Sequence, residues 1–186
     1  TEKLEFIPFN LEEAEAILAE EGYKRNSSGT LVDKSGEAFS VRFVNSSGGG
    51  PRADIATLAR ENWKKLGVNI EYAEYEWNVF IGQYVMPGNF DVLVLGWSGG
   101  LNFDKRQLFH SKYQPPNGLN FAGLNNAEAD RLMEKILTVY DPDEQVRLSH
   151  EIFSIIADDC PYIWIYSPFS TSVMDRRIVW RQQVGE

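Results

Sequence analysis

Two closely spaced glutamates and two histidines are the residues of this chain best suited to catalysis. Glu74 and Glu76 alternate along a predicted strand, so their carboxylates share one face, where a pair can act as general acid and general base. His110 and His150 lie far apart, and His150 has the setting of an exposed helix residue. A solvated strand face is the simpler interpretation of the glutamates. A small-ligand hydrolase is therefore a secondary hypothesis, and the chain is not expected to be an enzyme.

An apolar run that ends on glycines and one tryptophan suggests binding instead. Residues 92–95 read Val-Leu-Val-Leu, and residues 96–100 read Gly-Trp-Ser-Gly-Gly. In open α/β sheets, ligands bind beyond the carboxyl ends of the strands, and glycines there let a ligand approach the backbone. The pattern predicts a ligand-contact loop in which Trp97 forms a flat wall. A strand-end turn with a core tryptophan is an equally good interpretation.

A glycine-rich segment at 46–52, Ser-Ser-Gly-Gly-Gly-Pro-Arg, precedes a predicted helix. Free N–H groups at the start of a helix attract anions. The segment lacks the Lys-Ser/Thr of a P-loop and does not match Gly-x-Gly-x-x-Gly. A plain helix-start turn is the favoured interpretation, with a cleft-lining loop or a phosphate site as alternatives. Arg52 is interpreted as a surface residue, with contact to a ligand carboxylate as its alternative.

Strands and helices alternate along the first half of the chain, which is the pattern of an α/β layer. Apolar spacing, caps and turn residues predict the individual elements. Helices are expected at 11–21, with Asn10 as N-cap, and at 55–67, 78–86, 127–140 and 143–158. Strands are expected at 30–33 and 38–44, which could pair, and at 68–77, 90–97 and 161–168, with a last extended piece at 171–180. The apolar run within 90–97 predicts a strand covered on both faces.

Composition and charge restrict the function classes. A chain of 186 residues fits one domain, and its net charge of −9 argues against nucleic acid, which needs a clustered basic face. The sequence contains no apolar run of about 18 residues, so no membrane-spanning helix is predicted. The single cysteine, Cys160, excludes an internal disulfide and is expected to be a buried structural thiol. No cofactor is predicted, and no spaced His or Cys set predicts a metal site.

Five segments stand out by their order along the chain: NLEEAEAILAEEGY at 10–23, VRFVNSSGGGPRADIATLARENWKKLGVNIEYAEYEWNVF at 41–80, GNFDVLVLGWSGG at 88–100, HSKYQPPNGLNFAGLNNAEADRLMEKI at 110–136 and DPDEQVRLSHEIFSIIADDCPYIWIY at 141–166. In this order they resemble the family 5 extracellular solute-binding proteins, the dipeptide, oligopeptide and nickel-type receptors of ABC importers. Residues 10–172 carry the best of the match.

The resemblance implies an α/β fold, namely a single lobe of a type II periplasmic-binding-protein-like clamshell with a mixed sheet flanked by helices. Residues 1–186 are expected to form a single domain, the C-terminal ligand-binding lobe of a larger two-lobed receptor. Residues 173–186 are expected to lead back towards the other lobe. A lipoprotein leader and a further large lobe are expected upstream of Thr1. The lobe by itself is expected to be monomeric and to bind solute feebly.

The resemblance also implies the site. The family binds ligand with the residues that follow a Gly-Trp pair and with the aromatic residue of a W..F segment. The corresponding positions in this sequence are Trp97, Ser98, Gly99, Gly100 and Trp77. Tyr84, which follows Trp77 by a helix turn or two, is expected to line the same cleft. A core role is the alternative for Trp77.

Position 100 departs from the peptide-binding pattern. Peptide-specific relatives have an Asp there that pairs with the peptide's α-amine, a charge-assisted contact worth about 1.5–3 kcal/mol, whereas this chain has Gly100. The segment WSGGLNFD resembles another branch more closely, in which Asn102 and Phe103 stand where Asp and Pro are frequent and Asp104 is retained. Asn102 and Asp104 are therefore further candidate ligand residues, with Asp104 as a replacement amine partner.

The expected function is extracytoplasmic capture of a peptide or related small solute between two lobes, followed by delivery to the membrane subunits of an ABC importer. The resemblance implies a periplasmic or extracellular protein that is membrane-anchored as the full-length lipoprotein. A metal complex or a sugar fits the resemblance as well as a peptide does. A stand-alone protein-interaction domain is the remaining alternative.

Overall fold

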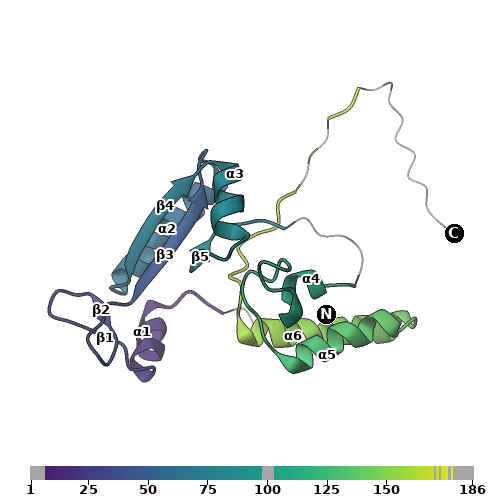
Figure 1. Ribbon diagram of the computed structural model, residues 1–186, viewed down its shortest axis with the longest axis horizontal. Coiled ribbons are helices and arrows are strands. Elements are labelled where there is room, and N and C mark those ends of the chain that lie inside the picture. The colour runs from purple at the N-terminus through teal and green to yellow at the C-terminus, as the bar shows by residue number, and fades with distance from the viewer. Residues whose placement is uncertain (1–6, 98–102, 170, 172, 176, 178–186) are drawn as a thin grey trace.

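The computed structural model describes residues 7–97, 103–169, 171, 173–175 and 177. These residues form a sheet-containing layer, a helical layer and a small helix–hairpin unit near the N-terminus (Figure 1). The predicted α/β class is confirmed.

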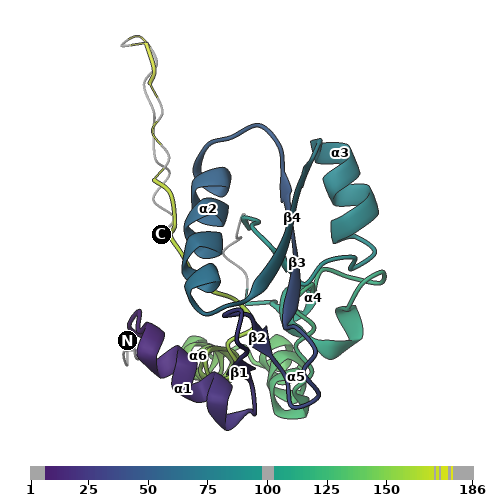
Figure 2. The ribbon, with the colours of Figure 1, turned by 90° about the vertical axis from the view of Figure 1, so that its left-hand side faces the viewer.

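A parallel three-stranded sheet is the centre of the first layer. Its order is β4 (Asn69–Tyr75), β3 (Ser40–Ser46) and β5 (Val92–Leu93). Parallel neighbours need a crossover connection, and α2 (Pro51–Lys65) supplies it between β3 and β4. Figure 2 shows α2 on one face of the sheet and α3 (Trp77–Val79) on the other. All of these elements were predicted from the sequence, apart from their bounds.

Alternating side chains of β3 anchor the two helical faces. Phe43 packs against Trp63 of α2, with ring centroids 5.9 Å apart. Its neighbour Val44 points to the opposite face, where it forms a buried cluster with Phe80 and Val85. Both of these residues lie in η1 (Phe80–Val85), a π-helical continuation of α3. The central strand therefore fixes the position of the segment that carries Trp77.

The strand expected at 90–97 is shorter than predicted. Only Val92 and Leu93 pair with β3, opposite Phe43 and Val44. Asp91 enters the sheet through its backbone N–H, which donates to the Arg42 carbonyl at 3.0 Å. Residues 92–95 are only half-buried, and β5 is an edge strand among the described strands, so the prediction of a strand covered on both faces is wrong for these residues.

The second layer consists of helices around a separate core. α5 (Ala127–Lys135) and α6 (Pro142–Asp159) lie side by side, preceded by α4 (Arg106–Phe109) and the 3₁₀ turn η2 (Ser111–Tyr113). A 3₁₀ turn, η3 (Ile136–Thr138), ends α5, so the helix expected at 127–140 is shorter than predicted. The core consists of Phe109, Leu124, Ala129, Leu132, Met133, Ile136, Leu148, Ile152 and Ile156.

The helix–hairpin unit contains α1 (Leu11–Glu20), β1 (Lys24–Arg25) and β2 (Leu31–Val32). The predicted N-cap is confirmed, because the Asn10 side chain accepts hydrogen bonds from the N–H groups of Glu12 and Glu13. β2 pairs with β1, whereas the segment at 38–44 contacts β2 only through the isolated bridge from Val32 to Ala38. The antiparallel pairing of the described residues thus lies in this hairpin and in that bridge, whereas the three-stranded sheet is parallel.

Two predictions near the end of the chain are wrong. The segment 161–168 forms no strand, and Ile163, Trp164, Ile165 and Tyr166 are 74%, 64%, 56% and 60% exposed. A strand needs a neighbour for its backbone groups, and no described strand lies beside this one. Cys160 is exposed instead of buried, because it ends α6 in the left-handed conformation, with φ 47°. The described residues within 171–180 form no strand either.

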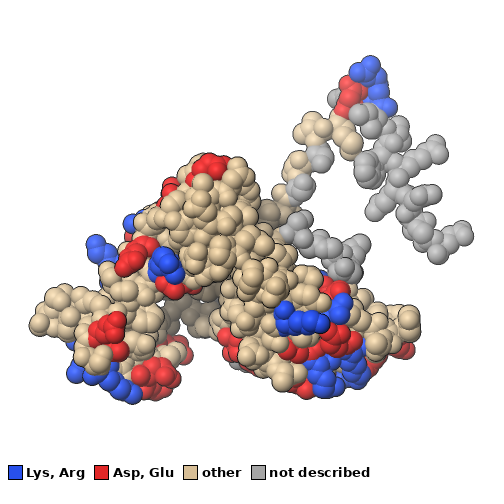
Figure 3. Space-filling model, in the orientation of Figure 1, with Lys and Arg blue, Asp and Glu red and all other residues tan. Residues whose placement is uncertain are grey.

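Charged side chains are unevenly distributed over the surface. In Figure 3 they gather over α5 and α6 and over the helix–hairpin unit, whereas much of the sheet-containing layer facing the viewer is uncharged. Among the described residues, no helix combines the length and apolarity that a membrane crossing requires.

Candidate ligand-binding hollow at the sheet edge

Trp77 and Trp97, two of the predicted ligand residues, line one hollow of about 260 Å³. We call it the sheet-edge hollow, because Trp77 follows β4 and Trp97 follows β5 at the carboxyl ends of these parallel strands. This is the edge at which ligands bind in open α/β sheets. Among the described residues, the lining consists of Trp77, Ile81, Val85, Met86, Leu95, Gly96, Trp97, Leu119 and Phe121.

Trp77 is held at the edge by the local fold of its own segment. The Glu76 carboxylate accepts the backbone N–H of Asn78 at 2.8 Å and so caps α3 just after β4 ends. The Trp77 ring packs against Phe80, with centroids 5.9 Å apart, and Arg52 lies over the ring at 5.2 Å. The side chain is still 43% exposed, so the core alternative does not describe Trp77 in this chain.

Trp97 is half-buried and stacks on Phe121. The two ring planes differ by 13°, and their centroids are 5.7 Å apart. Phe121 belongs to a loop that is fixed by the fully buried Asn120. The Asn120 amide donates to the carbonyls of His110 and Leu124, at 3.2 and 2.8 Å, and accepts the Leu124 N–H at 3.1 Å. The loop that carries Phe121 is therefore fixed by three hydrogen bonds.

The remaining sequence candidates are not all brought together. Tyr84 does not line the hollow, and it stacks on Tyr75 with ring centroids 4.1 Å apart. Asp104 pairs with Arg106, whose Nε and Nη2 donate to the two carboxylate oxygens at 3.0 Å each. These hydrogen bonds hold the pKa of Asp104 below its usual value. Ser98, Gly99, Gly100 and Asn102 lie outside the described residues.

Leu119, Phe121 and Met86 are lining residues that the sequence did not reveal. Phe121 lies 24 positions beyond Trp97, and the stack forms because the loop around Asn120 folds back onto the sheet edge. No periodicity or spacing signals such a contact. The one available hint is an aromatic residue next to a polar residue in the segment Leu119–Leu124, a region that is also part of the family resemblance.

The glycine-rich loop ends at the same edge of the sheet. Gly48, Gly49 and Gly50 all have positive φ, and Gly50 precedes α2 without a side-chain cap. The buried Asn45 ties the end of β3 to this loop, because its amide donates to the Arg52 carbonyl at 3.2 Å. The arrangement is that of a helix-start turn beside Trp77.

The candidate catalytic residues have local structural partners. Glu74 accepts the Tyr72 hydroxyl at 2.5 Å, and Glu76 caps α3 as described above. His110 lies 3.4 Å from both Asp130 and Glu134 of α5, and its Nδ1 accepts the Lys112 N–H at 3.1 Å. These contacts hold the loop before η2 against the helical layer.

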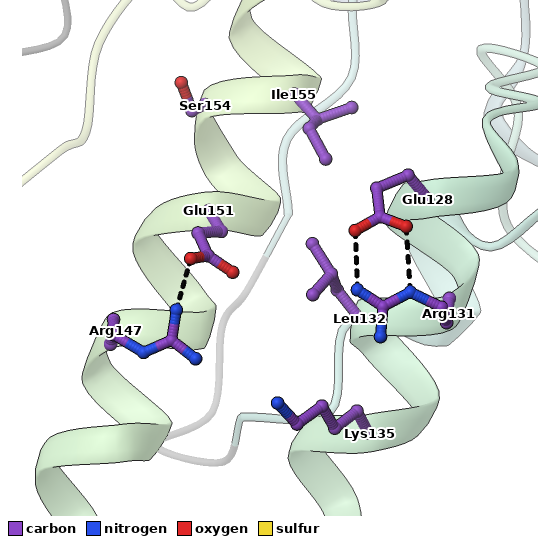
Figure 4. A pocket seen from close by; sticks show the side chains of 8 residues that line it. All are labelled: Glu128, Arg131, Leu132, Lys135, Arg147, Glu151, Ser154 and Ile155. Carbon is purple, nitrogen blue, oxygen red and sulfur yellow. Dashed lines mark hydrogen bonds and ion pairs between the residues drawn. The ribbon is translucent and has the colours of Figure 1, made fainter.

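Figure 4 shows a second hollow, between α5 and α6, of about 540 Å³. Its cations are paired with carboxylates: Arg131 with Glu128, and Arg147 and Lys135 with Glu144. None of the predicted ligand residues that the structure describes lines it. Among the described residues, no group of three His, Cys, Asp or Glu side chains could hold a metal ion.

A parallel sheet between helices, with an aromatic hollow at its carboxyl edge, defines the chain as an α/β lobe of the type II periplasmic-binding-protein class. The chain belongs to the bacterial extracellular solute-binding proteins, family 5, whose model for the middle region matches residues 1–120. The predicted family resemblance is thus confirmed.

Individual relatives agree with this assignment. The oligopeptide-binding protein AppA of Bacillus subtilis (strain 168) is 33% identical over 171 residues, which are 91% of this chain and 31% of AppA. The structure of AppA in complex with a nonapeptide matches 87% of this chain and 32% of that chain, with a TM-score of 0.79 and 32% identity. The oligopeptide-binding protein of Thermus thermophilus, complexed with a pentapeptide, shares the fold, with a TM-score of 0.77 and 23% identity over 86% of this chain and 30% of that chain. The chain spans about a third of the length of these relatives.

Proposed function

We propose that residues 1–186 form one lobe, the C-terminal ligand-binding lobe, of a two-lobed receptor that captures a peptide or related small solute for an ABC importer. The observation that carries the proposal is the sheet-edge hollow, which places Trp77 and Trp97 together at the carboxyl edge of the parallel sheet. Family membership supports solute binding, and the two relatives described above were solved with peptides.

Capture requires a second lobe in this proposal. The sheet-edge hollow is open on one side, so this lobe supplies only half of the apolar burial for a solute. Hinge closure against the other lobe would bury the rest and shift the receptor towards the closed, ligand-bound state. The complete receptor acts outside the cytoplasm, anchored as a lipoprotein, and contacts the importer's membrane subunits.

An enzymatic role is the alternative with a specific sequence feature behind it. Residues 96–100 read Gly-Trp-Ser-Gly-Gly, which matches the Gly-x-Ser-x-Gly pattern of a nucleophile elbow. Such an elbow requires a helix directly after the serine. Ser98 and the residues that follow it up to position 102 lie outside the described residues, so the elbow hypothesis rests on the sequence pattern alone. We favour binding without chemistry on the solute because the family and the relatives described above are solute-binding proteins.

The proposal is tested with the complete receptor that contains this lobe. Mass spectrometry of solute released from the purified receptor identifies the ligand class, and calorimetry measures its affinity for the complete receptor and for residues 1–186 alone. We expect binding by the receptor and at least about 100-fold weaker binding by the lobe, which corresponds to losing about 2.7 kcal/mol. The proposal would be contradicted if the lobe alone bound the solute less than about 100-fold more weakly than the receptor does. It would also be contradicted by hydrolysis of the solute that stops on Glu74→Gln or Ser98→Ala substitution.

A further inference from the structure

We infer that the sheet-edge hollow is a side-chain subsite that selects solutes carrying one large, uncharged apolar group, such as a phenylalanine or leucine side chain of a peptide. The inference rests on the proposed function and narrows its substrate class. It assigns a specificity role to Phe121, which no sequence motif marked as a ligand residue.

The chemistry of the lining supports this selection. Among the described residues, every side chain that lines the hollow is hydrophobic, and none is charged or carries an amide. An apolar group that enters leaves water for an apolar environment, which is favourable. A lysine or glutamate side chain would lose its hydration without finding a partner, which is strongly unfavourable. Arg52, the cation that lies over the Trp77 ring, is not part of the lining.

The size of the hollow supports one group and not a whole solute. Pockets that enclose complete small ligands have volumes of about 300–1,000 Å³, whereas this hollow measures about 260 Å³. It therefore fits a single large side chain, while the rest of the solute lies outside, towards the other lobe. Met86, at the rim and 37% exposed, is flexible enough to adapt the opening to aromatic or branched aliphatic groups.

The geometry of the aromatic side chains is that of a preformed binding surface for a solute side chain. Phe121 and Trp97 form a near-parallel stack, and Trp77, which comes from a different segment, lines the same hollow. The Asn120 hydrogen bonds fix the Phe121 loop before any solute arrives. A preformed wall loses little conformational freedom on binding, so the energy of apolar contact is retained as affinity.

The test uses the complete receptor and a set of tripeptides measured by calorimetry. The set is trialanine and its variants with a single Phe, Leu, Lys or Glu at each of the three positions. We expect a Phe or Leu peptide, at one position, to bind at least about 10-fold more tightly than trialanine, a difference of about 1.4 kcal/mol, and the Lys and Glu peptides at that position to bind no better than trialanine.

Variants locate the preference in the hollow. Phe121→Ala should reduce the ratio of Phe-peptide to trialanine affinity at least about 5-fold, and Phe121→Leu, which keeps an apolar wall, should retain most of it. Leu137→Ala, a partly exposed leucine in η3 outside the hollow, is the matched control and should leave the ratio unchanged. Thermal unfolding of each variant checks that the receptor is folded.

The outcomes separate the inference from the proposed function. Peptides that bind with equal affinity whatever their side chain, or an apolar preference that survives Phe121→Ala in the folded receptor, would overturn the inference and leave the receptor function intact. The inference is overturned in the same way if a crystal structure of the complete receptor shows a side chain of its other lobe filling the hollow. A receptor that binds no member of the peptide set would overturn the proposed peptide specificity and the inference together.

Discussion

The buried Asn120 offers a direct test of how the aromatic wall is held. Replacing it with alanine removes three hydrogen bonds and leaves the His110 and Leu124 carbonyls and the Leu124 N–H without these partners. Asn120 is 0% exposed, so water cannot substitute for the lost amide without opening the loop. At a net value of about 1 kcal/mol for each hydrogen bond, the loss is about 3 kcal/mol.

This loss is measurable by urea unfolding and by calorimetry. For a chain of this size, about 3 kcal/mol lowers the melting temperature by roughly 6–12 °C. Asn117→Ala is the matched control, because Asn117 is exposed in the same region, and its substitution should change the free energy of unfolding by less than about 0.5 kcal/mol. A loss below about 1 kcal/mol for Asn120→Ala would show that the loop is not held by these bonds, and the argument for a rigid wall would fail.

Three further predictions concern the backbone, an ion pair and the thiol. Gly67→Ala should destabilise the chain by more than about 2 kcal/mol, because φ of Gly67 is 83° and a Cβ there would collide with the Gly29 carbonyl oxygen of the hairpin turn. Gly36→Ala, where φ is 89° and the space around the Cβ is open, should cost only about 1 kcal/mol in the same unfolding assay. Equal losses for the two variants would refute the steric argument. Hydrogen bonds from Arg147 lower the pKa of Glu144 to about 2. The stabilisation linked to Glu144 is therefore present above the ordinary pKa of 4.5 and is lost as the pH falls towards 2. NMR titration of the Glu144 carboxylate should show a midpoint near this lowered pKa, and Arg147→Met should raise the midpoint. A midpoint near 4.5 in the unaltered chain would contradict the ion pair. Cys160 should react with a thiol reagent in the folded chain about as fast as in urea, and strong protection in the folded state would show that it is covered.

Local signals were sufficient for most of the fold. Asn10 caps α1 as predicted because capping depends on one side chain and the next few N–H groups. The crossover from β3 through α2 to β4 was predictable because the period of apolar residues changes from two to about 3.6 along the sequence. The placement of Trp77 and Trp97 at one edge then followed from the parallel arrangement of their strands.

Long-range contacts account for what the sequence could not predict. The stack of Phe121 on Trp97 depends on a loop that folds back over 24 positions, and nothing in the spacing marks it. Cys160 lies between two acidic residues and an apolar run, and a lone cysteine there was expected to be buried, but α6 ends at this residue, which has a left-handed backbone and is exposed. The family resemblance correctly indicated the class of fold, yet it did not indicate that Tyr84 would stack on Tyr75 instead of lining the hollow.

The exposed segment Ile163–Tyr166 should make the isolated chain prone to aggregation. Its side chains are exposed, uncharged and of types that favour β-strands. An exposed extended segment of this kind tends to pair with the same segment of another molecule and to aggregate. Concentrated solutions should therefore turn cloudy on warming, and lysine in place of Ile163 and Ile165 should keep them clear. In the two-lobed receptor proposed above, we expect the same segment to be a contact surface that the rest of the protein covers.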